Sequence, residues 1–357
     1  MNKKILFITQ KVDKNDDILG VYHEWIKNLA SKVEQVSVIC LYRGYVELPA
    51  NVQVYSLGKE QASSVIKAIS RLLYVIRFYK YIWRLRGDYD TVFVHMNSEY
   101  VLLGGFLWKL WHKKIIFWYN HPIGTWKARA AISFSRFVLH TSPYAFAARY
   151  KKAKQMPVGI DTEFFRRRPE IPKKKRSILY IGRISPIKNI DILIDALRFL
   201  DQKGIDFMLT IAGEPSKSSE YQYAKKIKEQ AAPLVGRGKI KFIGSVPNQK
   251  TPELYNEHEI CVNLTPTGSF DKMIIEAMSC ETPVLVSNRT LADIFDADLQ
   301  SRLIFQEKNA TDLAMKLGAL LRSSASTELT EIGARMRQLV VGKHDLKKMI
   351  AELILII

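Results

Sequence analysis

The stretch Ser177-Ile-Leu-Tyr-Ile-Gly-Arg-Ile-Ser-Pro-Ile-Lys-Asn-Ile-Asp191 decides the fold of the second half of the chain. Its first part, residues 178–181, is apolar and β-prone and ends at Gly182. From position 190 the apolar residues follow the helical period, at Ile190, Leu193, Ile194, Leu197 and Leu200. The pattern predicts a strand, a turn and a helix, with Asn189 as the N-cap of the helix.

The loop between this strand and this helix carries two cations, Arg183 and Lys188. We expect them to lie beside the backbone N–H groups of the helix N-terminus, where anions bind. Two cations and a helix N-terminus suit a diphosphate better than one carboxylate, because each charge-assisted hydrogen bond needs its own acceptor oxygen. The alternative is that both are solvated loop charges, which contribute little.

The composition indicates a folded protein with two domains. The chain has 357 residues, of which 47% are hydrophobic and 25% charged.

The sequence contains no pattern typical of membrane insertion or secretion. Its apolar runs are too short for a membrane span, and the apolar core of its first residues is too short for a secretory signal, so we expect a cytoplasmic protein. Cys40, Cys261 and Cys280 lack metal-binding spacing and are expected to be reduced, buried thiols. No Asp-x-Asp motif stands in a suitable place, since Asp296-Ala-Asp298 falls in a late polar segment.

Positive charge is concentrated in the first half of the chain. Residues 1–168 hold 27 Lys and Arg against 12 Asp and Glu, a net charge of +15, whereas residues 169–357 hold 27 against 23, a net charge of +4. A phosphorylated substrate, an anionic membrane surface and nucleic acid are all possible counterparts of such a basic half.

Apolar, β-prone runs alternate with helical patterns through both halves. In the first half the predicted strands are 4–10, 35–41, 52–56, 91–95, 114–119 and 138–142, with a helix at 21–32. In the second half they are 178–181, 207–212, 239–243, 260–264 and 284–287, with helices from 190, about 221 and 272. This alternation is typical of parallel α/β sheets. No Gly-x-Gly-x-x-Gly follows any of these strands, which argues against a dinucleotide site.

The predicted architecture is two doubly wound, Rossmann-like domains that face each other across a cleft. Residues 1–165 form the N-terminal domain. Its last residues, 156–165, are predicted to be a short strand that leads out of this domain. The charged, proline-containing segment 166–176 is a linker. Residues 166–344 form the second domain, and a final helix within 345–357 packs back on the first.

Two segments of the first half mix basic and aromatic residues. Residues 61–86 carry six Lys or Arg and no acid, and residues 100–160 carry ten Lys or Arg and again no acid. Basic and aromatic side chains together suit the surface of an anionic membrane, which we assign to residues 61–86 and 100–154. Helices with one face in the core and a solvated basic face explain the same pattern equally well. Nucleic acid is not expected, because no recognition motif accompanies the charge.

Two residues of the first half are candidates for ligand contact. Gly20 lies between the first strand and the first helix, where a glycine lets a ligand approach the backbone or simply makes the turn. His121 follows the strand at 114–119, at the edge where open α/β sheets bind ligands. It could hold a phosphate or a sugar hydroxyl, or bond a backbone carbonyl.

Four motifs in one order and spacing carry a family resemblance. They are Gly182-Arg-Ile-Ser-Pro-Ile-Lys-Asn189, Ile211-Ala-Gly-Glu214, Phe242-Ile-Gly-Ser-Val-Pro247 and Glu276-Ala-Met-Ser-Cys-Glu-Thr-Pro-Val284. Together they resemble glycosyltransferase family 4, a retaining, metal-independent family with the GT-B fold. The first half matches only through its first strand and Gly20, through His121, and through Val158-Gly-Ile-Asp161.

The resemblance implies a role for each matching residue. It implies that Gly182, Arg183 and Lys188 bind the diphosphate of a sugar nucleotide, and that both cations stabilise the leaving charge. Glu276 matches the second glutamate of the Glu-x7-Glu signature, which holds the ribose hydroxyls. His121 matches the histidine near the transferred sugar, and Gly20 the glycine beside the diphosphate. The nucleobase would pack on the turn that contains Ser245 and Val246.

The signature departs from the family at its first glutamate, which is Gly268 here. The family residue contacts hydroxyls of the sugar ring, so the donor sugar is left open. Asp271 could reach the same space, and the backbone N–H groups of Phe270, Asp271 and Lys272 could contact phosphate.

The function that these expectations imply is retaining transfer of a hexose from a nucleoside-diphosphate sugar, with UDP preferred, to an acceptor hydroxyl. No metal or other cofactor is expected. Assembly of a glycolipid, polysaccharide or lipopolysaccharide is favoured, on the inner membrane surface. The alternatives are a soluble small-molecule acceptor, or a non-catalytic binder of a phosphorylated ligand or nucleic acid.

Overall fold

The computed structural model describes residues 3–16, 19–61, 67–268, 271–322 and 327–357. The chain divides into two compact units, residues 1–159 with 346–357 and residues 160–345. The division falls six residues before the predicted boundary at 165/166. The reason is local, because the N–H of Ile160 donates to the carbonyl of His344 at 3.0 Å and Ile160 pairs with Asp345.

The first unit contains a parallel sheet whose described strands follow the order β3-β2-β1-β4-β5-β6-β7. The strands are β1 Lys4–Val12, β2 Gln35–Arg43, β3 Val52–Ser56, β4 Thr91–His95, β5 Lys114–Trp118, β6 Phe137–His140 and β7 Ala153–Gln155. The central strands are buried along nearly their whole length, because helices cover both faces of the sheet.

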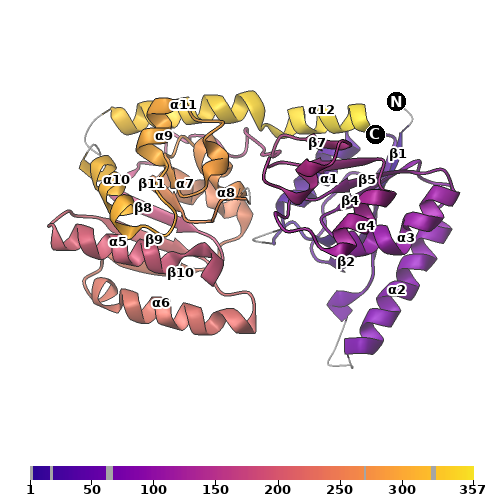
Figure 1. Cartoon of the computed structure of the whole chain (residues 1–357), viewed down its shortest axis with the longest axis horizontal. Coiled ribbons are helices and arrows are strands. Elements are labelled where there is room, and N and C mark those ends of the chain that lie inside the picture. Colours follow the sequence, from indigo (N-terminus) through magenta and orange to yellow (C-terminus); the bar gives the residue numbers. More distant parts are fainter. Residues whose placement is uncertain (1–2, 17–18, 62–66, 269–270, 323–326) are drawn as a thin grey trace. The chain divides into compact units, whose positions relative to one another are not determined.

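Helices cover this sheet in two groups (Figure 1). They are α1 Val21–Ala30, α2 Lys67–Arg84, α3 Ser98–Leu110, α4 Trp126–Phe134 and α12 Leu346–Ile356. One apolar core joins Trp25 of α1 and Met349 of α12 to the sheet, and a second joins Phe78 of α2 and Trp108 of α3 to its other face. The last helix of the chain is therefore part of the core of the first unit.

The second unit contains a parallel sheet whose described strands follow the order β10-β9-β8-β11-β12. The strands are β8 Lys174–Ile181, β9 Met208–Ala212, β10 Ile240–Gly244, β11 His258–Asn263 and β12 Val284–Val286. The helices are α5 Ile190–Gln202, α6 Ser218–Gly236, α7 Thr251–Glu257, α8 Lys272–Ser279, α9 Ala297–Leu303, α10 Ala310–Arg322 and α11 Glu328–Lys343. Figure 1 shows α5 and α6 side by side in this unit. The prediction of doubly wound α/β units is confirmed.

Short 3-10 turns connect several of these elements. They are η1 Lys59–Gln61, η2 Phe146–Arg149, η3 Pro186–Lys188, η4 Asn248–Lys250 and η5 Arg289–Leu291. No helix of the described residues is both long enough and apolar enough to cross a membrane.

The predicted strand at 156–165 is wrong. The last strand of the first sheet, β7, ends at Gln155, and beyond it only Ile160 forms an isolated bridge. Pro157 has no N–H to give to a ladder, and Gly159 has a φ of +76°, which is outside the β region. The Gly159 carbonyl instead accepts a hydrogen bond from the indole Nε1 of Trp25 at 2.9 Å.

Candidate functional site

Most of the predicted site residues follow the strands of the second sheet. Because these strands are parallel, their carboxyl ends meet at one edge, where ligands bind in open α/β sheets. Arg183 and Lys188 follow β8, Ser245 and Val246 follow β10, and Asp271 follows β11. This edge of the second unit is the candidate site.

Three glycines close the ends of β8, β9 and β10. Gly182, Gly213 and Gly244 have φ angles of +149°, +150° and +75°, which favour glycine. The N–H of Gly182 donates to the Ala212 carbonyl at 3.0 Å, and that of Gly213 to the Gly244 carbonyl at 2.7 Å. A Cβ on Gly213 would lie 2.0 Å from the Gly182 carbonyl oxygen. The three turns thus pack backbone against backbone directly before Arg183.

Arg183 is held by an acid from α6. Its Nε lies 3.3 Å from Oε1 of Glu220, and its Nη1 donates to Oγ of Ser216 at 3.3 Å. The other Glu220 oxygen accepts from the Ser216 N–H at 3.0 Å. Burial acts to raise the pKa of Glu220, but the bonds from Ser216 and the charge of Arg183 outweigh it and lower that pKa. An ionised Glu220 therefore keeps the guanidinium in the loop.

Lys188 is held by a polar cluster beyond β11. Its ammonium group pairs with Oδ2 of Asp271 and donates to Oγ1 of Thr265 at 3.0 Å. The same carboxylate oxygen accepts from Nδ2 of Asn263 and from Oγ1 of Thr265, both at 3.0 Å. Burial acts to raise the pKa of Asp271, but the Lys188 charge and these bonds lower it. Asp271 is thus a fixed anion, and in this structure it binds Lys188.

The predicted N-cap role of Asn189 is wrong. Asn189 has a φ of +46°, and its side chain donates to the Leu264 carbonyl at 3.1 Å without capping α5. The hydroxyl oxygen of Tyr223 accepts instead from the N–H groups of Ile190 at 2.8 Å and Asp191 at 3.3 Å. The first N–H groups of α5 are therefore already bonded, and the loop offers a ligand mainly its two cationic side chains.

Glu276 is a buried carboxyl group of α8. Its Oε2 accepts from the Tyr255 hydroxyl at 2.9 Å, and its Oε1 accepts from Nδ2 of Asn248 at 3.3 Å. Burial raises the pKa of Glu276 to about 7, although these two bonds and the charge of Lys272 act to lower it. Lys272 lies one helical turn earlier, and burial lowers its pKa to about 7. The two groups therefore titrate near neutrality.

Gly268 stands where the family signature has its first glutamate. Its φ of +114° is a conformation that L side chains rarely adopt, so a glutamate there would be strained. The preceding Thr267 is tied down, because its N–H donates to Oε1 of Glu307 at 2.7 Å. Phe270 lies outside the described residues.

The remaining candidates, Gly20 and His121, belong to the first unit. Gly20 precedes α1 with a helical φ of −57°, and a Cβ there would lie 2.5 Å from the Asp16 carbonyl oxygen. Close packing against that carbonyl therefore requires the glycine. His121 is exposed beyond β5, and its carbonyl accepts from the Phe146 N–H at 2.8 Å.

Several residues that hold the site could not be expected from the motifs. They are Glu220, Tyr223, Asn248, Tyr255, Asn263 and Thr265. The sequence could have indicated Asn263 and Thr265, because they lie at the carboxyl end of a predicted strand. Glu220 and Tyr223 had no such signal, because they belong to α6, more than thirty residues further along the chain than the loop residues that they contact. Among the described residues, no group of three or more His, Cys, Asp and Glu is placed to hold a metal ion.

Residues 161–338 match the family model described as Glycosyl transferases group 1. The chain is 26% identical over 174 residues to the D-inositol 3-phosphate glycosyltransferase of Salinispora tropica, and this alignment covers 48% of this chain and 36% of that protein. It is 26% identical over 201 residues to the lipopolysaccharide 1,2-N-acetylglucosaminetransferase of Salmonella typhimurium, and this alignment covers 53% of this chain and 52% of that protein. The alignments thus span about a third to a half of these curated relatives.

Two solved structures resemble the whole chain in fold. The crystal structure of Anabaena Alr3699/HepE in complex with UDP and glucose has a TM-score of 0.77 at 16% identity, covering 99% of both chains. The sucrose-phosphate synthase of Thermosynechococcus elongatus has a TM-score of 0.80 at 16% identity, covering 99% of this chain and 98% of that one. These likenesses confirm the predicted GT-B fold.

Proposed function

Because residues 161–338 belong to the glycosyl transferases group 1 family, we propose that the chain transfers a sugar from a nucleoside-diphosphate sugar to an acceptor hydroxyl. One observation carries the proposal. Within the matched segment, the cations Arg183 and Lys188 lie in the loop after β8, and Lys188 pairs with Asp271, the residue directly before α8. The buried carboxyl group Glu276 belongs to α8. A sugar nucleotide offers that set of groups a diphosphate and a ribose diol.

The two cations would act on the leaving group. Departure of a nucleoside diphosphate builds negative charge on the β-phosphate, and preorganised cations stabilise it in the transition state. Arg183 is fixed by Glu220, and Lys188 by Asp271, so neither has to be ordered during the reaction. We propose that these cations supply the positive charge that a metal supplies elsewhere, so that the reaction needs no metal.

The other predicted residues complete the donor site in this proposal. Glu276 would accept hydrogen bonds from the ribose, and the turn at Ser245 and Val246 would pack on the nucleobase. His121 would contact the transferred sugar, and Gly20 would lie beside the diphosphate. UDP is the preferred nucleotide, since the neighbour Alr3699/HepE was solved with UDP and with UDP-glucose.

We propose retention of the anomeric configuration. The acceptor hydroxyl would enter from the face that the diphosphate leaves, and the departing diphosphate would take its proton. A hexose is the proposed sugar, and the acceptor is proposed to belong to glycolipid, polysaccharide or lipopolysaccharide assembly. The Salmonella relative is named as a lipopolysaccharide transferase, which supports that acceptor class. The relative named as an inositol 3-phosphate glycosyltransferase supports the alternative, a soluble acceptor.

The proposal is tested by release of nucleoside diphosphate from a panel of UDP-linked and GDP-linked hexoses. We expect at least one donor to be turned over by the purified chain without added metal and in the presence of a chelator. If every donor stays intact in the presence of both lipid-linked and soluble acceptors, the proposed function fails.

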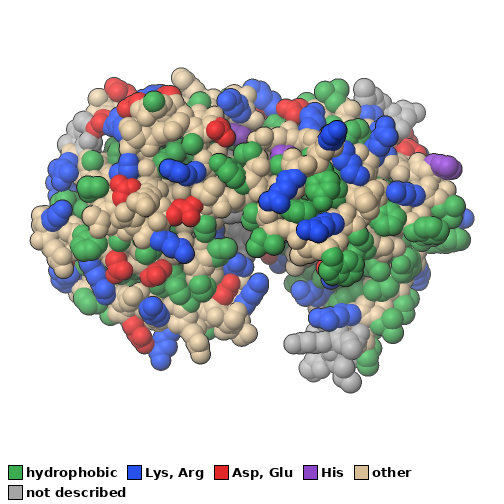
Figure 2. Space-filling view, viewed as in Figure 1, with side chains coloured by type: hydrophobic (Ala, Val, Ile, Leu, Met, Phe, Trp, Pro, Cys, Tyr) green, Lys and Arg blue, Asp and Glu red, His purple; other side chains and the backbone are tan. Residues whose placement is uncertain are grey.

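The surface of the first unit supports peripheral attachment to the cytoplasmic face of a membrane. Large apolar side chains are exposed on α2 and α3, and Figure 2 shows hydrophobic and basic side chains gathered over this region. They are Ile69, Leu72, Leu73, Ile76, Tyr79 and Trp83 of α2, with Phe106 and Leu110 of α3. Arg84 and Lys80 are exposed on α2 as well. Residues 62–66 of the predicted membrane segment lie outside the described residues.

This attachment predicts binding to anionic vesicles. Leu72 is 61% exposed and Ile76 is 53% exposed, so Leu72→Gln with Ile76→Gln removes apolar surface that faces solvent rather than the core. We expect the wild type to sediment with vesicles that contain phosphatidylglycerol, and the double variant to sediment several-fold less. Equal sedimentation of the wild type with neutral and anionic vesicles would contradict the attachment.

Asp271 gives a prediction on stability. Asp271→Ala removes the acceptor shared by Lys188, Asn263 and Thr265, and leaving such donors unsatisfied costs about 1–3 kcal/mol. We expect urea unfolding to show a loss of that size. Since Lys188 and Asp271 are in contact, Lys188→Met should cost less in the Asp271→Ala background than in the wild type. Strictly additive losses would contradict the pairing.

The same variant tests whether Asp271 also meets the donor sugar. A carboxylate that only holds Lys188 changes turnover of every donor by the same factor. One that also contacts sugar hydroxyls changes the preference between two hexoses of the same nucleotide. If Asp271→Ala leaves both the donor KM and kcat unchanged, Asp271 has no part in the donor site.

Donor affinity should depend on pH through Glu276. Burial raises the pKa of Glu276 to about 7, so the carboxyl group is largely protonated below that pH and ionised above it. Only the carboxylate accepts hydrogen bonds from both ribose hydroxyls, so the donor Kd should fall up to about tenfold between pH 6 and 8. Asp271, whose pKa is lowered, stays ionised throughout, and Tyr255, whose pKa is raised, stays neutral.

Calorimetric titration of a UDP-hexose across this range measures the effect. Glu276→Gln should abolish the gain in donor affinity with rising pH, because the amide does not titrate and Lys272, whose pKa is also about 7, can only lose positive charge over this range. Lys272→Met should move the midpoint to higher pH, because the Lys272 charge lowers the pKa of Glu276. A profile that keeps its slope in Glu276→Gln would show that another group is responsible.

A further inference from the structure

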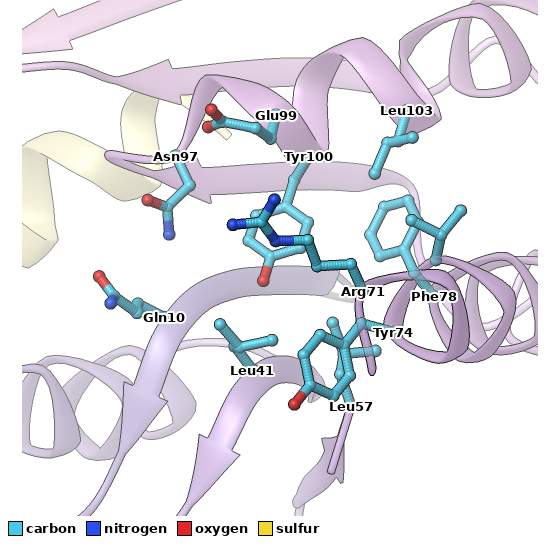
Figure 3. Close-up of a pocket in the computed structure, with 11 residues that line it drawn as sticks. Gln10, Leu41, Leu57, Arg71, Tyr74, Phe78, Asn97, Glu99, Tyr100 and Leu103 are labelled. Atoms are coloured by element: carbon cyan, nitrogen blue, oxygen red, sulfur yellow. The ribbon is translucent and has the colours of Figure 1, made fainter. Parts of the chain in front are cut away.

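The first unit contains a pocket of about 460 Å³ that is lined by none of the residues proposed for the donor site. Gln10 near the end of β1, Leu41 near the end of β2, Leu57 just beyond β3 and Asn97 just beyond β4 all line it. The pocket therefore sits at the carboxyl edge of the first sheet, where ligands bind in parallel α/β sheets. One side of α2 and the first turns of α3 close it (Figure 3).

The pocket has two chemically different ends (Figure 3). Its apolar end is formed by Leu41, Leu57, Tyr74, Phe78 and Leu103. Gln10, Asn97 and Glu99 lie together at the other end, and the guanidinium of Arg71 points toward them.

Arg71 is the charge that sets the character of the polar end. No ion pair involving Arg71 occurs within the described residues. The nearby carboxylate, Glu99, instead pairs with Nζ of Lys127 at 3.0 Å. The Arg71 guanidinium is thus available to an anionic ligand, and such a pairing is strong and directional. The amides of Gln10 and Asn97 can bond hydroxyl groups beside that anion.

We propose that this pocket holds the acceptor and that the acceptor is an anionic amphiphile. Its alkyl chain lies against the apolar end, its anionic group pairs with Arg71, and its hydroxyls meet Gln10 and Asn97. This inference rests on the proposed glycosyl transfer, and it selects a lipid-linked acceptor over a soluble sugar phosphate. A soluble acceptor would leave the apolar side chains without a partner, and a neutral lipid would leave Arg71 without one.

The test is calorimetric titration of the full chain with three probes: octyl phosphate, octyl glucoside and inorganic phosphate. The two octyl compounds are used below the concentrations at which they form micelles. Octyl phosphate carries both the chain and the charge, whereas each of the others lacks one of them. We expect octyl phosphate to bind most tightly, since each buried CH₂ tightens binding up to about fourfold and the phosphate adds the pairing with Arg71.

Two pocket variants and one matched control locate the binding. Arg71→Gln should weaken octyl phosphate at least about tenfold and leave octyl glucoside unchanged, because only the charged hydrogen bonds are lost. Leu103→Trp fills the apolar end and should weaken both amphiphiles. Arg84→Gln removes the same charge from an exposed position of α2 outside the pocket, and should change neither. Arg71 is itself exposed, so its replacement leaves the core intact.

Equal weakening in Arg84→Gln and Arg71→Gln would overturn the proposal, because it would indicate adsorption to a basic surface. So would equal affinity of the wild type for octyl phosphate and octyl glucoside. Nucleotide-sugar turnover by the wild type separates the two proposals. If donors are turned over but no amphiphile binds, the acceptor inference fails alone. If no donor is turned over, the proposed function fails, whatever binds in the pocket.

Discussion

Replacing Lys188 by alanine should lower kcat for sugar transfer about 10²–10³-fold while the protein stays folded. Removing one preorganised donor from a developing negative charge costs about 2.7–4 kcal/mol of transition-state stabilisation. Lys188 is preorganised by Asp271 and Thr265, so its ammonium group is in place before the β-phosphate gains charge. Arg183→Ala should have an effect of the same size, because Glu220 and Ser216 hold its guanidinium in the same way.

Single-turnover release of nucleoside diphosphate measures this loss without interference from product release. The matched control is Lys203→Ala, which removes an exposed lysine just beyond the other end of α5 and should leave kcat unchanged. Far-UV circular dichroism and the urea midpoint show whether each variant is folded. Near-normal turnover in both Lys188→Ala and Arg183→Ala would remove the mechanism.

Replacing Gly213 by alanine should destabilise the second unit by about 2–6 kcal/mol and abolish donor binding. An alanine at a φ of +150° costs about 1–3 kcal/mol of backbone strain. Its Cβ would also lie 2.0 Å from the Gly182 carbonyl oxygen, and relieving such an overlap costs about 1–3 kcal/mol. The overlapping atom is backbone, so the loop that carries Arg183 has to move.

Gly238→Ala separates the two contributions. Gly238 has a φ of +72°, but nothing lies within 4 Å of the Cβ that an alanine would add, so this variant carries strain without overlap. We expect urea unfolding to show a smaller loss for Gly238→Ala, with donor affinity retained. If Gly213→Ala matched Gly238→Ala in both measurements, the close packing of the three glycine turns would not matter for the site.

The strands of this fold could be predicted because each one is a short apolar run between polar turns. The predicted runs at 52–56 and 91–95 coincide with β3 and β4, and 35–41 lies within β2. Buried parallel strands are apolar on both faces, which makes such runs easy to find. Residues 156–165 misled the prediction because a run of apolar residues containing Pro157 and Gly159 has the composition of a strand but not its backbone.

The site could be predicted in part for a geometric reason. The carboxyl ends of parallel strands share one edge, so any charged residue after a predicted strand is a candidate, and Arg183 and Lys188 were proposed in this way. Asp271 was proposed from the family signature, because it lies three residues beyond Gly268. What holds these residues could not be predicted. Glu220 reaches Arg183 from α6, and Tyr223 takes the N–H groups expected to face the ligand. Such partners follow from tertiary packing and leave no periodicity in the sequence.

The first unit shows the same limit. The basic and aromatic composition of residues 61–86 predicted a surface that binds an anionic membrane. It could not distinguish the exposed side of α2 from the side that lines a pocket. Ile82 is buried in the core, Leu72 is exposed, and Tyr74 and Phe78 line the pocket. Only the rotation of the helix on its sheet assigns each residue to one of these surroundings.

The central claim is that Arg183 and Lys188 together bind the diphosphate of a nucleotide. It is tested most directly by calorimetric titration of the wild type and of the Arg183→Ala, Lys188→Ala double variant with UDP, UMP and uridine at constant ionic strength. We predict that the wild type binds UDP at least about tenfold more tightly than UMP, and that the double variant loses this difference. Equal affinity of the wild type for UDP and UMP, or an unchanged preference for UDP in the double variant, would contradict the claim.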